Sequence, residues 1–304
     1  MDLSNIEFPL RRPDGGYLGM TTLGEQDWCR DYAASRFKGN GALVELGSFM
    51  GSLTIPLAEG LKEAIQSGHL DKAAARIHVY DLFYWHRSMI PVVEDTPLSS
   101  ILNEGDWFFD VYKANTAHVE DMLEITWGDL GKEQWNGDEI EFLLLDCLKY
   151  DEITNNVIQS FFPATRPGLS SIAHQDYFHF YEWWTHLITF EQRGFLEIAE
   201  AVPDSGMLIL DVKKDLSKYC ADYDPQRDFS KTTPEQIEAA YAWNFSVIQE
   251  AFHQPLKAAR IWAYVWTGNP EKARQLYNEA SPEDQLSPAF QDMKLYCDTE
   301  GFPF

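Results

Sequence analysis

Residues 43–54 have the sequence Leu-Val-Glu-Leu-Gly-Ser-Phe-Met-Gly-Ser-Leu-Thr, in which an apolar run meets an acid, two glycines and the start of a helical pattern. This order predicts a strand, a tight turn and a helix N-terminus. Glycines at such a junction let the backbone approach a ligand closely, and the free N–H groups at a helix start favour an anionic or polar group. We therefore predict that this stretch forms the floor of a cofactor site.

The composition limits the functions that the chain can have. Its 304 residues can hold one large α/β domain, or such a domain plus a small helical one. A formal net charge of −24 argues against a nucleic-acid partner, because phosphate binding needs a basic stripe. No apolar run approaches the length of about 18 residues that suggests a membrane helix, and the four cysteines lie far apart. We expect an acidic, cytoplasmic protein with reduced thiols and no membrane partner.

The turn belongs to a strand–helix–strand unit. A strand at 42–46 precedes it, a helix with an apolar residue at every fourth position follows it, and a second buried strand at 76–81 ends in Asp81. Such a unit is a right-handed crossover between parallel strands. The acid at the end of its second strand faces the ligand crevice, where it can accept hydrogen bonds from ribose hydroxyls.

The rest of the chain extends this pattern into a doubly wound α/β fold. We predict a mostly parallel, Rossmann-like sheet with a closing β-hairpin, and three domains: an N-terminal arm at 1–21, a main domain at 22–213 and a C-terminal helical extension at 214–304. The further elements expected are strands at 122–126, 139–145 and 169–173, hairpin strands at 195–202 and 207–212, and helices from residue 232 onward.

These pieces resemble the class I S-adenosylmethionine-dependent methyltransferases over residues 22–213. The resemblance rests on Val-Glu-Leu-Gly-Ser-Phe-Met-Gly-Ser at 44–52, on Asp81, on Trp127-Gly128-Asp129 and on the apolar strand that reaches Asp146. Within the class the chain is most similar to the macrocin-type small-molecule O-methyltransferases. The resemblance implies that S-adenosylmethionine is the cofactor and that it is bound by Glu45, Gly47, Ser48, Gly51, Ser52, Asp81, Gly128, Asp129 and Asp146.

The same resemblance implies a metal and a base, with two departures. Those enzymes commonly bind Mg²⁺ through an acid after strand four and an acid pair after strand five, which here correspond to Asp146, Gln175 and Asp176. The amide at Gln175 lowers the charge of such a site while keeping an oxygen donor. Leu148 stands where the family's general base is expected.

Three other residues are candidates for the missing base. His174, His179 and Lys149 follow the ends of the fourth and fifth strands, and a histidine titrates near neutral pH. Each histidine is alternatively a packed, hydrogen-bonded residue. Tyr177, Trp183 and Trp184 are candidates for the wall of a substrate pocket, or else belong to the core.

We expect methyl transfer to a hydroxyl of a small, sugar-like or secondary metabolite. The alternative is a catalytically altered protein of the same fold that binds the cofactor in a regulatory or assembly role, which the missing base supports. A nicotinamide-dependent reductase is disfavoured, because the turn has Gly-x-x-x-Gly spacing and lacks Gly-x-Gly-x-x-Gly. The C-terminal helices are expected to cover the sheet or to form a homodimer contact.

Overall fold

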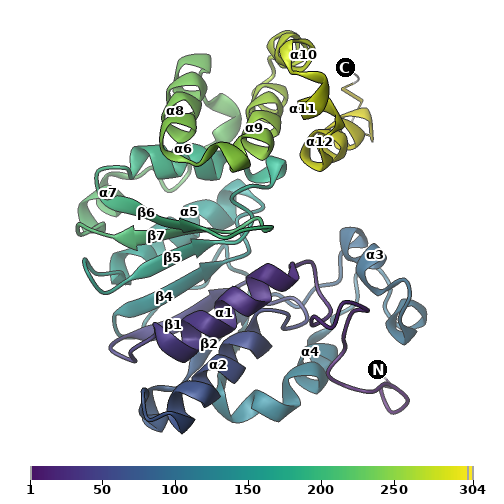
Figure 1. Ribbon diagram of the computed structural model, residues 1–304, viewed down its shortest axis with the longest axis vertical. Coiled ribbons are helices and arrows are strands. Elements are labelled where there is room, and N and C mark those ends of the chain that lie inside the picture. Colours follow the sequence, from purple (N-terminus) through teal and green to yellow (C-terminus); the bar gives the residue numbers. More distant parts are fainter. Residues whose placement is uncertain (1, 300, 303–304) are drawn as a thin grey trace. The chain divides into compact units, whose positions relative to one another are not determined.

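The stretch at 43–54 folds into the strand, turn and helix that its sequence predicts (Figure 1). Strand β1 (Ala42–Leu46) has the predicted bounds, and helix α2 (Thr54–Gln66) begins three residues after Gly51. Leu57 and Leu61 of α2 are fully buried, as their spacing predicts. The structure is a computed structural model that describes residues 2–299 and 301–302.

The chain divides into two compact units. The first comprises Met1–Cys147 and Val202–Ser205, and the second comprises Leu148–Ala201 and Gly206–Phe304. This division falls inside the main domain expected at 22–213, so the expected boundaries at 21/22 and 213/214 stay a prediction. Residues 1, 300, 303 and 304 of the expected arm and extension lie outside the described residues.

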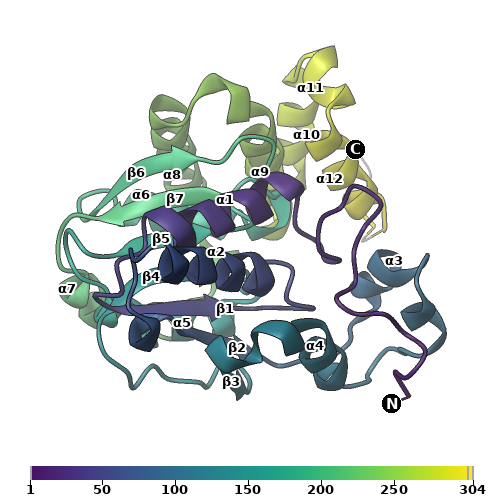
Figure 2. The same ribbon diagram turned by 60° about the horizontal axis from the view of Figure 1, so that its bottom comes forward.

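The first unit contains four parallel strands in the order β3-β2-β1-β4. Every residue of β4 is buried, which is typical of a parallel strand covered on both faces. Helices α1 and α2 lie side by side (Figure 2), and a Cβ at Gly60 would come within 2.2 Å of the Arg30 carbonyl oxygen. A glycine is therefore needed where these helices meet. The other elements of this unit are α1 (Leu23–Ser35), β2 (Ile77–Asp81), α3 (Ile90–Val93), α4 (Phe109–Thr116), β3 (Leu123–Trp127) and β4 (Ile140–Leu145).

The second unit contains the predicted hairpin and the C-terminal helices. Strand β7 pairs antiparallel with both β5 and β6. The elements of this unit are α5 (Asp151–Ser160), β5 (Ser171–His174), α6 (Trp184–Glu191), β6 (Leu196–Ala201), β7 (Leu208–Val212), α7 (Ser217–Asp222), α8 (Pro234–Val247), α9 (His253–Trp266), α10 (Pro270–Glu279), α11 (Pro282–Leu286) and α12 (Pro288–Thr299).

The seven strands have the sheet order β3-β2-β1-β4-β5-β7-β6. This confirms the predicted fold class, a mostly parallel Rossmann-like sheet with a closing hairpin and C-terminal helices. Among the described residues, no helix has both the length and the apolar character that crossing a membrane requires.

Candidate cofactor site

The glycine turn is held in an unusual backbone conformation. Gly47 and Gly51 have φ values of 85° and 86°, and Phe49 between them has a φ of 48°. A Cβ at Gly47 would lie 2.3 Å from the carbonyl oxygen of Asp146, so this position tolerates only glycine. A phenylalanine in the left-handed region costs free energy and persists only where the surroundings enforce it, which is common at functional sites.

The carboxylate of Asp81 enforces that conformation. Its Oδ2 accepts hydrogen bonds from the backbone N–H groups of Ser48 at 2.7 Å and Phe49 at 2.8 Å. Its Oδ1 accepts one from the N–H of Phe83 at 2.6 Å, and Phe83 is also left-handed, with a φ of 52°. Burial raises the pKa of Asp81, and these backbone donors oppose the rise. Asp81 therefore organises the turn itself, and its role as the ribose ligand stays a prediction.

Glu45 lies below the turn as a fully buried carboxyl group. The hydroxyl of Thr54 donates to Oε2 at 2.6 Å, whereas Oε1 is buried and has no hydrogen-bond partner among the described residues. Burial raises the pKa of Glu45 to about 8, and the neighbouring Asp146 and Asp81 carboxylates add to the rise. A buried oxygen without a partner is costly, so this one marks a place where a ligand would complete the site.

The remaining residues of the predicted set lie around the same strand ends. The N–H of Gly128 donates to the carbonyl oxygen of Asp81 at 3.0 Å, which joins the ends of β2 and β3. The Asp129 carboxylate accepts from Lys132 and from the N–H of Gly131, and both hydrogen bonds lower its pKa. The N–H of Asp146 donates to the Leu46 carbonyl oxygen at 2.9 Å.

These residues fit S-adenosylmethionine as the resemblance implies. The cofactor carries an ammonium and a sulfonium group, and three carboxyl groups come from the first unit: Glu45, Asp81 and Asp146. The turn carries glycine at 47 and 51, the two positions where its backbone packs closely against Asp146 and Thr116. The unpaired oxygen of Glu45 is suited to an ammonium group, directly or through water.

The second unit joins two of the other predicted residues, Lys149 and Asp176, in an ion-pair cluster. The ammonium group of Lys149 contacts the Asp176 carboxylate and lies 2.7 Å from Oε1 of Glu182. Glu182 is buried and was not among the predicted residues, because a lone acid in an aromatic segment gives no signal in sequence. Lys149 and Asp176 are therefore paired with each other in this structure.

This cluster does not fit a magnesium site. An ammonium group already binds the Asp176 carboxylate, and Gln175 is a buried neutral amide. Within the described part of the chain, no group of three or more His, Cys, Asp or Glu side chains could hold a metal ion. We therefore derive no step from a metal bound by Asp146, Gln175 and Asp176.

The two candidate histidines lie in different environments. His174 is 2% exposed, its Nε2 has no hydrogen-bond partner among the described residues, and burial lowers its pKa to about 3. His179 is exposed as a residue, but protein atoms crowd its imidazole, and this desolvation and the nearby Lys149 ammonium lower its pKa. Both histidines are thus neutral near pH 7, and their role as bases stays a prediction.

The three predicted substrate residues lie in the core of the second unit. Tyr177, Trp183 and Trp184 have no exposed surface. The Tyr177 hydroxyl donates to Asn244 at 2.5 Å, and the Trp184 indole N–H donates to the Leu148 carbonyl oxygen at 3.1 Å. The structure thus shows the packed arrangement that the sequence left open, and a role in a pocket wall stays a prediction.

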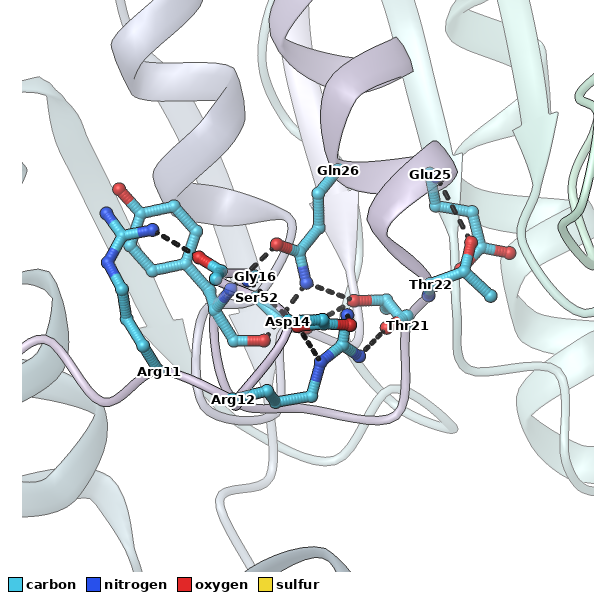
Figure 3. Close-up of polar contacts among 11 residues, drawn as sticks. Arg11, Arg12, Asp14, Gly16, Thr21, Thr22, Glu25, Gln26 and Ser52 are labelled. Atoms are coloured by element: carbon cyan, nitrogen blue, oxygen red, sulfur yellow. Dashed lines mark hydrogen bonds and ion pairs between the residues drawn. The ribbon is translucent and has the colours of Figure 1, made fainter.

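No sequence pattern indicates the residues that hold the N-terminal arm (residues 1–21) against the turn. Thr21 donates from Oγ1 to Oγ of Ser52 at 3.0 Å, and Gln26 binds both Thr21 and Tyr17 (Figure 3). The Arg11–Arg12 pair is occupied within the arm: Arg12 pairs with Asp14, and Arg11 donates to a backbone carbonyl. Both arginines therefore have local partners within the arm.

Comparisons with known proteins give only distant similarities. No family model and no curated protein matches the chain. Similar solved structures include cofactor-bound Rv0187 from MTB, at 16% identity and a TM-score of 0.40 over 64% of this chain and 81% of that one. The mitomycin 7-O-methyltransferase MmcR matches at 12% identity and a TM-score of 0.35, over 63% of this chain and 54% of its own.

A third similar structure is CalO1, a methyltransferase in calicheamicin biosynthesis, in its SAH-bound form. It matches at 13% identity and a TM-score of 0.33, over 62% of this chain and 54% of its own. Methyltransferases are thus among the solved structures that the chain resembles. The chain spans little more than half the length of MmcR and CalO1. Such distant likenesses establish neither a family nor an activity, so the chain's own residues must support a function.

Replacing Asp81 by Ala should destabilise the protein by about 3 kcal/mol, because three backbone N–H groups in the turn and after β2 lose their acceptor. Urea unfolding of the wild type and the variant measures this difference. The matched control is Asp129→Ala, whose carboxylate binds only its own loop and should cost less than about 1 kcal/mol. Equal effects of the two substitutions would contradict the organising role of Asp81.

Glu45 should make the protein less stable as the pH rises. Its folded pKa of about 8 exceeds the ordinary value of 4.5, so between these pH values the folded state holds a proton that the unfolded state has released. The free energy of unfolding should therefore fall between pH 4.5 and 8 and level off above it. Glu45→Gln should remove this loss, which amounts to a few kcal/mol, whereas the surface variant Glu63→Gln should keep it. Parallel pH profiles for wild type and Glu45→Gln would exclude this effect.

The pairing of Lys149 with Asp176 predicts that Mn²⁺, used as a probe for Mg²⁺, finds no stoichiometric site. Electron paramagnetic resonance of Mn²⁺ titrated into the protein should show only weak, non-saturating binding to this acidic chain. One tightly bound Mn²⁺ per chain that disappears in Asp176→Asn would show that the implied metal site exists.

Proposed function

We propose that the protein binds S-adenosylmethionine at the turn 47–51 and transfers its methyl group to a hydroxyl of a small metabolite. The observation that supports this most directly is Glu45, a buried carboxyl group with an unpaired oxygen beneath a glycine turn. Burial is the main cause of the raised pKa of Glu45, and the neighbouring Asp146 and Asp81 carboxylates raise it further, which places negative charge around this residue. Such a site favours a cationic ligand.

The same electrostatics count against a nicotinamide dinucleotide. That cofactor presents a pyrophosphate to the glycine turn of its binding fold, and its two negative charges are stabilised there by a helix N-terminus. Here the Asp81 and Asp146 carboxylates, which oppose the ionisation of Glu45, would repel them. The charge of the site therefore favours S-adenosylmethionine over a nicotinamide dinucleotide, as the spacing of the glycines also does.

The residues of the chain have distinct roles in the proposed binding. Gly47 and Gly51 allow close approach of the backbone, Asp81 fixes the turn, and Glu45 provides the acceptor for an ammonium group. When bound, the cofactor supplies a methyl carbon made electrophilic by its sulfonium. In the transfer the bond from sulfur to this carbon breaks, a bond from the acceptor oxygen forms, and the hydroxyl proton passes to a base. His174, His179 and Lys149 are the candidates for that base.

The second candidate function is cofactor binding without catalysis, in a regulatory or assembly role. It is favoured by Leu148 at the expected base position, and by Lys149, whose ammonium group is engaged by two carboxylates. Both functions share the cofactor site of the first unit and differ in whether an acceptor is methylated.

Calorimetric titration with S-adenosylhomocysteine tests the shared step. Its ammonium group should lower the pKa of Glu45 from about 8, so binding at pH 7 should release close to one proton. The measured enthalpy should then vary with the ionisation enthalpy of the buffer. Glu45→Gln should abolish this proton release and weaken binding.

The outcomes separate the functions. Absence of binding by S-adenosylhomocysteine and S-adenosylmethionine would exclude both, and binding of NAD instead would favour the reductase. If the cofactor binds, incubation with labelled S-adenosylmethionine and a panel of hydroxylated metabolites distinguishes the enzyme from the binding protein. Transfer of label to any acceptor supports the enzyme.

A further inference from the structure

Residues 10–21 form an ordered substructure. A short antiparallel bridge joins Arg11 to Tyr17, and the N–H of Leu18 donates to the carbonyl oxygen of Leu10 at 3.0 Å. Leu10, Tyr17 and Leu18 are each less than 10% exposed. The guanidinium group of Arg12 donates to the Thr21 carbonyl oxygen and so closes this part of the arm (Figure 3).

Two buried carboxamides connect this part of the arm to the rest of the first unit. Gln26 on α1 accepts from the N–H of Tyr17 at 2.8 Å and donates to its carbonyl oxygen at 3.0 Å. Asn115 on α4 accepts from the N–H of Leu10 at 2.6 Å and donates to the carbonyl oxygen of Met50 at 2.5 Å. Asn115 thus joins the arm directly to the glycine turn.

A third connection ends at Ser52, the residue directly after the turn. Thr21 accepts from the Gln26 amide at 3.1 Å and donates to Ser52 at 3.0 Å, and all three side chains are buried. The arm approaches so closely that a Cβ at Gly19 would lie 2.3 Å from Oγ of Ser52. Backbone and side chain of the turn are therefore both held by the arm.

We propose that Thr21, Gln26 and Asn115 are positioning residues for the cofactor turn and act on it through the N-terminal arm. The arm binds Ser52 directly and Met50 through Asn115, at the end of this stretch of chain. Asp81 binds Ser48 and Phe49, at its beginning. Docking of the arm and occupation of the turn are then coupled. This inference rests on the proposed function, since it takes the ligand of the turn to be the cofactor.

Coupling of this kind is reciprocal. If the docked arm increases the affinity of the turn for a ligand, the ligand must stabilise the docked arm by the same factor. Binding at the turn should therefore slow hydrogen exchange of the Leu10 and Tyr17 amides, which are bonded to Asn115 and Gln26. A residue that only stabilises the fold would not produce this ligand-dependent protection.

Thr21→Val tests the proposal with little change in shape. It removes the hydrogen bonds to Ser52 and from Gln26, so the affinity for S-adenosylhomocysteine should fall about tenfold. Exchange of the amides at 47–54 should become about tenfold faster in the ligand-free protein, and protection of Leu10 and Tyr17 by the ligand should shrink. Gly19→Ala should act in the same direction, because the added methyl group meets Ser52.

The neighbouring Thr22→Val is the matched control. Thr22 is the N-cap of α1, with its hydroxyl accepting from the N–H of Glu25, and among the described residues its side chain has no hydrogen bond to the turn. This variant should lower the melting temperature and leave the affinity for S-adenosylhomocysteine unchanged.

Unchanged affinity and unchanged exchange in Thr21→Val would overturn the proposal, as would equal losses of affinity in both variants. If the wild type binds no S-adenosylhomocysteine, the proposed function fails. Exchange at 47–54 in the ligand-free variants then still decides whether the arm orders the turn: faster exchange in Thr21→Val alone supports it, and equal exchange in both refutes it.

Discussion

The structure of the glycine turn at 47–51 depends on one carboxylate. Asp81 accepts backbone hydrogen bonds from two residues in the left-handed region, Phe49 and Phe83, and from Ser48. Each left-handed phenylalanine costs of the order of 1–3 kcal/mol. Hydrogen bonds to an ionised acceptor contribute about as much and thus offset the strain. The strand pairing sets the position of Asp81, which lies opposite Trp127 on β3, so the strained turn is anchored to regular structure.

The acidity of the site opposes the stability of the folded chain. Glu45 is buried beside two other carboxylates, and its pKa of about 8 means that the fold holds it as a neutral acid at pH 7. A hydrophobic residue at this position would avoid the desolvation cost and the unpaired oxygen. A buried acid that destabilises its own fold is typical of a site whose ligand provides the missing charge.

Local patterns were enough to predict the elements of the fold. The strand at 42–46 and the hairpin strands show apolar residues bounded by glycine or turn residues, and these signals come from a few neighbouring positions. The connection between Leu10 and Asn115 spans 105 positions, and a buried carboxamide that binds backbone groups follows no periodic pattern. The aromatic residues after β5 are a similar case. Their sequence does not indicate whether they line a pocket or belong to the core, because this depends on the packing of the second unit, which buries them. Asp81 was placed at the correct strand end, but its backbone partners depend on φ values that no sequence pattern indicates.

The chemical nature of the connections between arm and turn is consistent with a cationic ligand. Thr21, Gln26 and Asn115 are uncharged, and the charged groups Arg12 and Asp14 pair with each other within the arm. A lysine or arginine at the turn would bind its carbonyl groups equally well, but it would also offset the negative charge of Asp81 and compete with the ammonium group of a ligand. Uncharged hydrogen-bonding groups fix the backbone and leave the negative potential in place. The arm can therefore position the turn without weakening the attraction that the carboxylates would exert on the proposed cationic cofactor.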